Sequence, residues 1–489
     1  MKKVLPAFLL LSVLLAGLVT GAGYALKSGI EDMTRNTVLN LMGPGESSVA
    51  KVSFNPLTRL VTVTGWSTTY SAGPEVCHAE IEQACGTITI RGLITCLPLL
   101  DRLFFDDTDI IPVIGNLAVK NCTYQGVSLL GRISGLSIKT VSLPYTLAKQ
   151  YCGGARPPFA ASVNGFGADH VLIEDCTASK IKRGKTASTL TIKSAEIDGL
   201  TGANAARMRC REIFQGSAKE SWTADSLVLE DIRISPELLS ELIALGRSPA
   251  GLVPSSFKKS LDANGRIFSH AEARNAGHTS KGLASPISAP LCTLDWYEEE
   301  GQSVGLHIDN MSVPAENFPP DLKPGLAGME AVHISGDAHI KNLSRPSCSA
   351  TFAIAGLADF KGSIDLYPDN LSFSGLKIIW QDHGLMSRLA RCAADEPHLA
   401  SMAIKTAVMS LCSGGSESDR LQCENMADFV DRPGTLTIAM RPGIVCPLFS
   451  WPALLSNFGS FFEVRTDQGS SSLTEQQEKP FLSSGSTGQ

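Results

Sequence analysis

The segment Gly301-Gln-Ser-Val-Gly305 matches the Gly-x-Ser-x-Gly pattern that surrounds the nucleophile of many serine hydrolases. In those enzymes a strand precedes the serine and a helix follows it, because the sharp turn between them exposes the hydroxyl. Here the acidic run Glu298 to Glu300 precedes the pattern and the strand-like run Leu306-His-Ile-Asp309 follows it. The flanks therefore predict a hairpin turn, in which Ser303 is not catalytic.

Two further patterns have the residue types of a site but lack part of it. His333, Asp337 and His339 share parity and would face one side of a strand as a metal half-site. Gly336 is expected to break that strand, and no third nitrogen or sulfur ligand lies nearby in sequence. The Gly184-Lys-Thr186 tripeptide resembles a phosphate loop, but Ser179 occupies the place of the required upstream glycine. We assign no catalytic, cofactor-binding or metal-binding residue and no cofactor.

The chain contains 13 cysteines and no Cys-x-x-Cys. The absence of this motif excludes thioredoxin-like redox chemistry and the common zinc ribbons. In an oxidising compartment many of these cysteines would form disulfides, and the odd number would leave at least one unpaired. The candidate groups are Cys77 with Cys85 or Cys96, and Cys392 with Cys412 and Cys423. The alternative is that the cysteines serve as small apolar side chains.

The amino terminus predicts export. Lys2 and Lys3 precede the uncharged run from Val4 to Leu26, which is long enough to span a bilayer. Residues 1–26 are therefore an uncleaved anchor with the amino end in the cytoplasm, or a signal peptide cleaved after Ala25. The net charge of -6 argues against nucleic acid as a partner. The membrane is the expected partner, together with lipid or envelope proteins.

A weak repeat follows a predicted stalk at residues 27–45, which begins with a helix over Lys27 to Met42. A hairpin is expected around 55–58. The segments Leu117-Ala-Val-Lys-Asn-Cys-Thr123 and Val171-Leu-Ile-Glu-Asp-Cys-Thr177 lie 54 residues apart. Each is followed at the same distance by a second strand-like run, at Leu136 and at Leu190, and Leu227-Val-Leu-Glu-Asp-Ile232 is a third copy of the first run. Such spacing predicts stacked units that lie side by side.

These patterns predict a mainly β fold with a minor helical part (α+β), built as elongated antiparallel sheets from repeated strand pairs. We expect a β-rich repeat domain at 46–246, closed by a helix from Pro236 to Leu245 that Ser235 caps. A linker at 247–290 and a second β-rich domain at 291–465 follow, with a three-helix insertion near 384–430. Residues 466–489 are expected to be a disordered tail.

The strands alternate apolar with polar residues, so one face of each sheet should be apolar and the other wet. An open, twisted sheet would turn the apolar faces into a groove able to hold an acyl chain. The alternative is that these faces pack against one another as the core of a sandwich.

The Lys-led anchor, the run Val52-Ser-Phe-Asn-Pro-Leu57 and the strand Thr435-Leu-Thr-Ile-Ala-Met-Arg-Pro442 together resemble the layout of the AsmA-like bacterial envelope proteins. The resemblance implies an inner-membrane anchor, a periplasmic β-rich body and a non-enzymatic part in envelope lipid binding, lipid transfer or outer-membrane maintenance. The alternative function is a structural or protein-interaction component of the cell envelope. A third possible function is that of an exported hydrolase.

Overall fold

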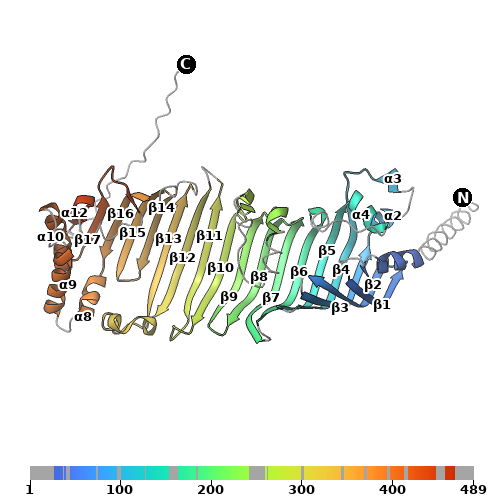
Figure 1. Cartoon of the computed structure of the whole chain (residues 1–489), viewed down its shortest axis with the longest axis horizontal. Helices are drawn as coiled ribbons and strands as arrows, with labels where there is room; N and C mark the ends of the chain where they lie inside the picture. Colours follow the sequence, from blue (N-terminus) through green and yellow to red (C-terminus); the bar gives the residue numbers. More distant parts are fainter. Residues whose placement is uncertain are drawn as a thin grey trace, which may run out of the picture. The chain divides into compact units, whose positions relative to one another are not determined.

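Figure 1 shows the computed structural model of the chain. It describes residues 27–467 except 37, 40–44, 73–74, 96–100, 127, 154–163, 183–184, 240, 242–258, 261–262, 299–301, 343–345, 368–371, 394–396, 412–416 and 448–457. Two compact units are present: unit 1 contains the chain up to Pro319 with Met329–Pro346, and unit 2 contains Pro320–Gly328 and the chain from Ser347. The predicted anchor at Val4 to Leu26 and nearly all of the predicted tail lie outside the described residues. No described helix is long and apolar enough to cross a membrane.

Unit 1 is one antiparallel sheet in which every strand pairs with the next strand along the chain. Its strands are β1 Gly45–Asn55, β2 Leu60–Ala72, β3 Glu75–Ile88, β4 Ile110–Gln125, β5 Leu129–Pro144, β6 Gly167–Lys182, β7 Lys185–Thr201, β8 Ala205–Ser217, β9 Glu220–Ile232, β10 His270–Ser280, β11 Ile287–Tyr297, β12 Ser303–Pro314 and β13 Ala331–Lys341. At about 4.8 Å between neighbours, these strands extend over roughly 58 Å.

A row of left-handed residues, which we call the crease, crosses this sheet in mid-strand. Each even-numbered strand from β2 to β12 contributes one residue with φ between 47° and 62°: Gly65, Asn121, Asp175, Glu212, Asn275 and Asn310. The register aligns them. For example, the pairs Lys120–Gly135 and Cys122–Ile133 enclose Asn121 on β4 and Ser134 on β5. Glycine adopts this conformation freely, and Asn and Asp are the side chains that tolerate it best.

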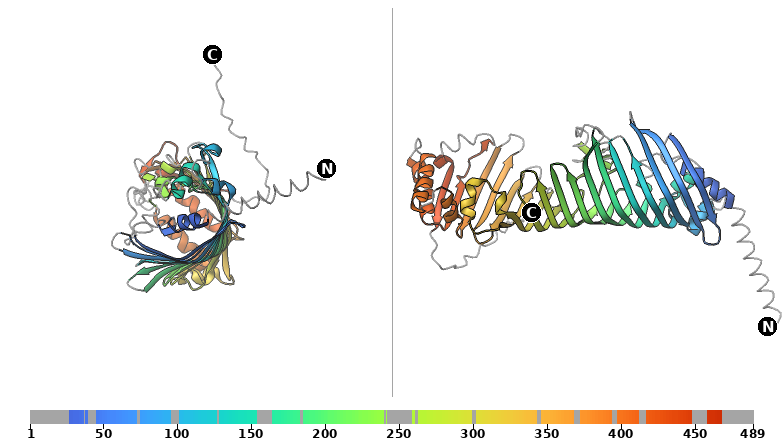
Figure 2. Two further views of the ribbon diagram at one scale, coloured as in Figure 1. Left: turned by 90° about the vertical axis from the view of Figure 1, so that its right-hand side faces the viewer. Right: turned by 90° about the horizontal axis from the view of Figure 1, so that it is seen from below.

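The crease interrupts the usual alternation of side chains in every strand that it crosses. Val119 and Cys122 on β4 therefore share the apolar face, opposite Leu136 and Ile133 on β5. Irregularities of this kind bend strands and increase their twist. Figure 2 shows the result: the strands of unit 1 curve around a concave side. A second, shorter row at Thr140, Gly199 and Asp231, on β5, β7 and β9, has φ between 50° and 62°.

Helices of unit 1 cover the first strands and some of the connections. Residues 27–36 are helical, as predicted, and Ile30 packs against the side chains of β1 and β2, including Phe54 and Trp66. The Glu31 carboxylate accepts a hydrogen bond from the Phe54 amide at 2.8 Å. The remaining named helices are α2 Ile90–Thr95, α3 Asp101–Phe104, α4 Tyr145–Cys152 and the 3-10 turn η1 Ala315–Asn317.

Unit 2 is a smaller antiparallel sheet with a closed core. Strands β14 Ser347–Ile354, β15 Ala358–Tyr367, β16 Ser372–Asp382, β17 Thr435–Met440 and β19 Phe462–Asp467 pair in that order, and β18 Cys446–Pro447 pairs with β16. The helical elements are η2 Pro320–Leu326, α8 Leu385–Ala393, α9 Pro397–Leu411, α10 Glu417–Asp431 and α12 Phe458–Phe461. Phe429 of α10 and Val464 of β19 are each 2% exposed and pack with Met386 and Leu436. Helices thus cover one face of this sheet.

The mainly β fold, the hairpin between β1 and β2 and the three helices of unit 2 confirm the sequence-based predictions. Residues 236–239 are helical, and the Ser235 hydroxyl caps them through the Leu238 amide at 3.2 Å. On α9 the helical spacing of Leu399, Met402 and Ala403 predicts a stripe that faces the core. This prediction is wrong, because Leu399 and Met402 are 46% and 53% exposed. Ile404 of the same helix packs into the core instead.

The predicted linker at 247–290 is wrong over its second half, where β10 and the start of β11 continue the sheet. The division between units follows at Pro319 and Pro346. Gly336 does not break its strand, because β13 runs through it from Ala331 to Lys341. Glycine lowers strand stability without abolishing ladder hydrogen bonds, so both neighbouring segments remain in one strand.

The predicted equivalence of the two repeat copies is confirmed for the first strand of each copy and is wrong for the second. Leu117 and Val119 of β4 share a face with Val171 and Ile173 of β6, through Ile138 and Leu136 of β5. The two copies are next-but-one neighbours instead of adjacent strands. Leu136 lies beyond the crease of β5, whereas Leu190 lies before the crease of β7, so these second runs are not equivalent.

Most of the described cysteines are free, as the alternative expects, but Cys423 is disulfide-bonded. Cys77 and Cys85 are free. They are eight positions apart on β3, or about 26 Å, far beyond the distance that a disulfide can bridge. Cys392 is also free. Cys96 and Cys412 lie outside the described ranges.

Candidate functional site

The concave face of unit 1 is apolar along the whole sheet. One row of cross-strand neighbours runs from Val63 through Ala84, Val119, Leu136, Ile173 and Ala195. It continues through Cys210, Leu227, Ala273, Cys292 and Ile308 to Gly336 of β13. The rows on either side, which pass through Ile138 and Ile192, likewise contain no charged residue among the strands. We call this surface the apolar face.

Only the first part of the apolar face is covered by described residues. The helix at 27–36 packs on β1 and β2, and Phe166 and Leu200 join a cluster around Ile138 and Val171 on β4 to β7. Among the described residues no buried hydrophobic cluster forms over β8 to β13. Leu306 of β12 is 39% exposed there. Cys210 and Ala289 on the same part of the face are 4% and 7% exposed. The described residues therefore leave this part of the face partly exposed, in contrast with the closed core of unit 2.

Several cysteines line the apolar face, among them the buried Cys210 of the row described above. Cys122, Cys176 and Cys292 are ladder partners of Ile133, Ile192 and Ile308, and each is partly buried. Burial raises the pKa of all three thiols above the ordinary value, because the thiolate loses hydration. Cys85 has the opposite orientation, with its thiol 3.7 Å from the Thr62 hydroxyl on the other face.

The other face of the sheet is polar and carries contacts between polar side chains of neighbouring strands, most of them between histidine and aspartate. His170–Asp198, His270–Asp295 and His307–Asp337 lie at 2.7, 2.6 and 2.7 Å. Lys193 of β7 contacts Asp175 of β6 at 2.6 Å in the crease. Hydrogen bonds from Lys193 and Ser134 lower the pKa of Asp175. These pairs stabilise the wet face of the sheet without forming a cleft.

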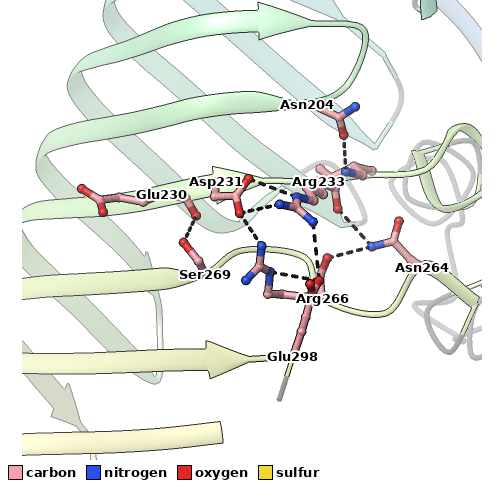
Figure 3. Close-up of polar contacts among 9 residues, drawn as sticks. Asn204, Glu230, Asp231, Arg233, Asn264, Arg266, Ser269 and Glu298 are labelled. Carbon is pink, nitrogen blue, oxygen red and sulfur yellow. Dashed lines mark hydrogen bonds and ion pairs between the residues drawn. The ribbon is translucent and has the colours of Figure 1, made fainter. Parts of the chain in front are cut away.

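The strand ends and the connections between strands form two opposite edges of the unit 1 sheet, and these two edges differ in charge. Near the ends of β9 and β11, Arg233 and Arg266 share the carboxylates of Asp231 and Glu298, with contacts at 2.9 Å for Arg233–Asp231 and 3.4 Å for Arg266–Glu298 (Figure 3). Asn264 holds the connection in place by donating to the Arg233 carbonyl at 3.0 Å. Both guanidinium groups are therefore neutralised in a network that fixes the strand ends.

The opposite edge carries lysines without such partners. Lys180, Lys182, Lys185, Lys219 and Lys281 occupy the ends of β6, β7 and β10 and the turn between β8 and β9, and all five are exposed. We call them the lysine rim. None has an ion-pair partner among the described residues. A pocket of about 420 Å³ lies against Lys182, Lys185, Thr186 and Ala187.

One buried carboxylate lies apart from these surfaces. Asp101 of α3 is 2% exposed and accepts hydrogen bonds from the Tyr145 hydroxyl at 2.6 Å and from Lys149 of α4 at 2.7 Å. These donors hold the pKa of Asp101 well below its ordinary value. Asp101 is therefore a permanently charged link between α3 and α4 at neutral pH, which does not suit a general base.

The structure separates the residues that the sequence singled out for possible chemistry. Ser303 is the first residue of β12, paired with Tyr297, and a strand follows it instead of a helix. His333, Asp337 and His339 do share one face of β13, but Asp337 pairs with His307 of β12. No group of side chains in the described part of the chain could hold a metal ion. Lys185 begins β7, so no helix follows the phosphate-loop-like tripeptide.

Sequence reasoning missed the extent of the apolar face. The signal was present, because an apolar residue followed by a charged residue and then Asn or Asp marks the crease in β4, β6 and β12. No family model, curated protein or solved structure matches this chain.

Proposed function

We propose that unit 1 binds the acyl chains of lipids along its apolar face. One observation carries the proposal: an uninterrupted apolar surface, one strand after another, that stays partly exposed over β8 to β13. Exposed apolar surface of this extent is rare in soluble proteins and marks a binding site. An acyl chain matches a long surface whose central rows contain no charged residue, because burial of apolar area needs no directional partner.

The dimensions support a lipid. The sheet extends over roughly 58 Å, about twice the ~30 Å hydrocarbon thickness of a bilayer. With the export signal at Val4 to Leu26, the protein would hold lipids outside the cytoplasmic membrane, anchored to it or released from it. We propose a non-enzymatic role in envelope lipid binding or transfer, in a bacterial periplasm.

The direct test is to purify the full chain in the absence of detergent, extract it with organic solvent and identify the extracted lipids by mass spectrometry. We expect stoichiometric lipid. A variant with Ala276→Trp should carry about half as much or less, because Ala224, Ala276 and Ala289 are cross-strand neighbours and an indole would fill that part of the face. The matched control is Thr223→Trp on the polar face of β9. Equal lipid in both variants would refute the groove.

The position of the bound lipid can be found from the cysteine thiols that it protects against alkylation. Added lipid should slow alkylation of Cys176 and Cys292, which line the apolar face, and leave Cys85 on the polar face unchanged. Peptide mass spectrometry separates the three. Equal slowing at all three thiols would indicate general compaction, and slowing only at Cys85 would place the ligand on the wrong face. If instead a folded protein partner protects Cys292 and lipid does not, the alternative of an interaction component holds.

A further inference from the structure

The lysine rim adjoins the apolar face at one edge of the sheet. Lys180 follows Ala178 on β6, and Ala178 is a ladder partner of Gly131 and Leu190. The Lys281 amide donates to the Lys219 carbonyl at 2.9 Å, so the ends of β8–β9 and β10 meet. Hairpins of this edge follow one another at about 10 Å, or two strand spacings. Positive charge therefore lines the edge for several strands beside an apolar floor.

The balance of charge along this edge is positive. Glu220 at the start of β9, Glu316 of η1 and Glu330 before β13 lie at the same edge as the five lysines, and Glu316 accepts from the Ser285 hydroxyl. At the opposite edge Arg233 and Arg266 are paired with Asp231 and Glu298 (Figure 3), and the exposed Lys341 ends β13. The lysine rim therefore gathers five exposed lysines at the ends of neighbouring strands.

Between the rim and the floor lies an aromatic pair. Trp222 of β9 is 50% exposed and stacks on His278 of β10, with ring centroids 3.9 Å apart. The His278 Nδ1 atom is buried and has no hydrogen-bond partner among the described residues. Buried polar atoms are normally paired. An indole beside an unpaired polar atom is the arrangement found where an apolar layer meets a polar one.

We propose that the lysine rim binds the phosphate of an anionic phospholipid headgroup whose acyl chains lie on the apolar face. The inference rests on the proposed groove and adds its substrate class and orientation. Lys219 and Lys281, three residues along the chain from Trp222 and His278, contact the headgroup of a lipid whose ester region lies over that aromatic pair. Lys182 and Lys185, beside the 420 Å³ pocket, contact a headgroup at the neighbouring hairpin. Lipids are then held with all their headgroups along the same edge of the sheet.

The test compares uptake of two lipids with identical acyl chains, phosphatidylglycerol and phosphatidylcholine, from donor vesicles by the full chain. We expect wild type to prefer phosphatidylglycerol by about tenfold at low salt, and the preference to fall as salt screens the rim. The triple variant Lys182→Gln, Lys185→Gln, Lys219→Gln should take up both lipids equally, with uptake of phosphatidylcholine unchanged. Circular dichroism checks its fold.

The matched control is Lys51→Gln, Lys120→Gln, Lys139→Gln, which removes the same charge from exposed lysines on the polar face. It should keep the preference. Loss of preference in the control as well, or its retention in the rim variant, overturns the inference while leaving the groove intact. Uptake of neither lipid by wild type refutes the groove itself. If the rim variant loses affinity only for inorganic phosphate, measured by calorimetry, the rim is a free-phosphate site and the lipid assignment is wrong.

Discussion

At Asn121 a glycine variant should be more stable than a valine variant, which is the reverse of the usual order within a strand. Asn121 lies in the middle of β4 with φ 48°, in the crease, where its side chain donates to Glu82. Glycine and valine both remove that hydrogen bond, so the comparison between the two variants isolates the backbone. A β-branched side chain in the left-handed region is strained by roughly 1–3 kcal/mol, and glycine is not strained there.

The reference position is Thr123, two residues further along β4 and outside the crease. Its backbone is not among those with positive φ. At such a site valine is favoured over glycine by about 1 kcal/mol. With about 2 kcal/mol of strain for valine at Asn121, the order reverses, and Asn121→Gly should be the more stable variant by roughly 1 kcal/mol.

Hydrogen exchange measured by mass spectrometry on β4 peptides is the suitable assay, because it reports local opening in a chain whose two units need not unfold together. Asn121→Val should exchange about five times faster than Asn121→Gly, since 1.4 kcal/mol corresponds to about a factor of ten. Thr123→Val should exchange more slowly than Thr123→Gly. The same order at both positions would show that the crease does not constrain the strand.

Four other outcomes follow from the structure. Val119→Asp should destabilise unit 1 by about 3 kcal/mol or more in urea titrations, because Val119 is 8% exposed on the apolar face, whereas Lys120→Asp on the polar face should be mild. The pKa of Asp175 is lowered from 3.8, so its ion pair stabilises the fold above that pH and the contribution disappears as pH falls through the folded value. Lys193→Met should therefore reduce stability at pH 7, and the reduction should shrink as pH falls through the lowered pKa of Asp175; a reduction that does not change with pH would contradict the pairing. Alkylation of Cys176 in the folded protein should need a higher pH than in urea, since burial raises its pKa; coincident pH profiles would mean that the thiol is fully hydrated. Ser303→Ala should leave fold and lipid content unchanged, and loss of an esterase activity in that variant would restore the hydrolase hypothesis.

The local features of the sequence predicted much of the fold. The Asn55 turn, the Ser235 cap and the helices that begin near Leu385 and Glu417 each depend on interactions within a few residues, and each is where it was expected. The repeat at Leu117 and Val171 was visible because both copies must place apolar residues on the same face and a tolerant residue in the crease.

The candidate site was less predictable. The alternation of apolar and polar residues identified an apolar face. It did not decide between an open groove and a sandwich, because the same residues face the interior in both. The crease also concealed the length of the strands, since the pattern in β4 changes phase between Val119 and Cys122 and reads as two shorter runs. The linker prediction at 247–290 failed for a related reason: the short side chains of β10, such as Ala271 and Ala273, give little apolar signal.

The sequence by itself determined the predominance of strands, the apolar and polar faces and the positions of most turns, because these follow from residue type and spacing along a short stretch of chain. Only the tertiary structure decided that the strands of unit 1 join into a single sheet, that the left-handed residues align into one crease, and that five lysines from separate hairpins share an edge. Each of these depends on register between strands, which is set by pairing across the whole sheet and is not recorded in any one segment.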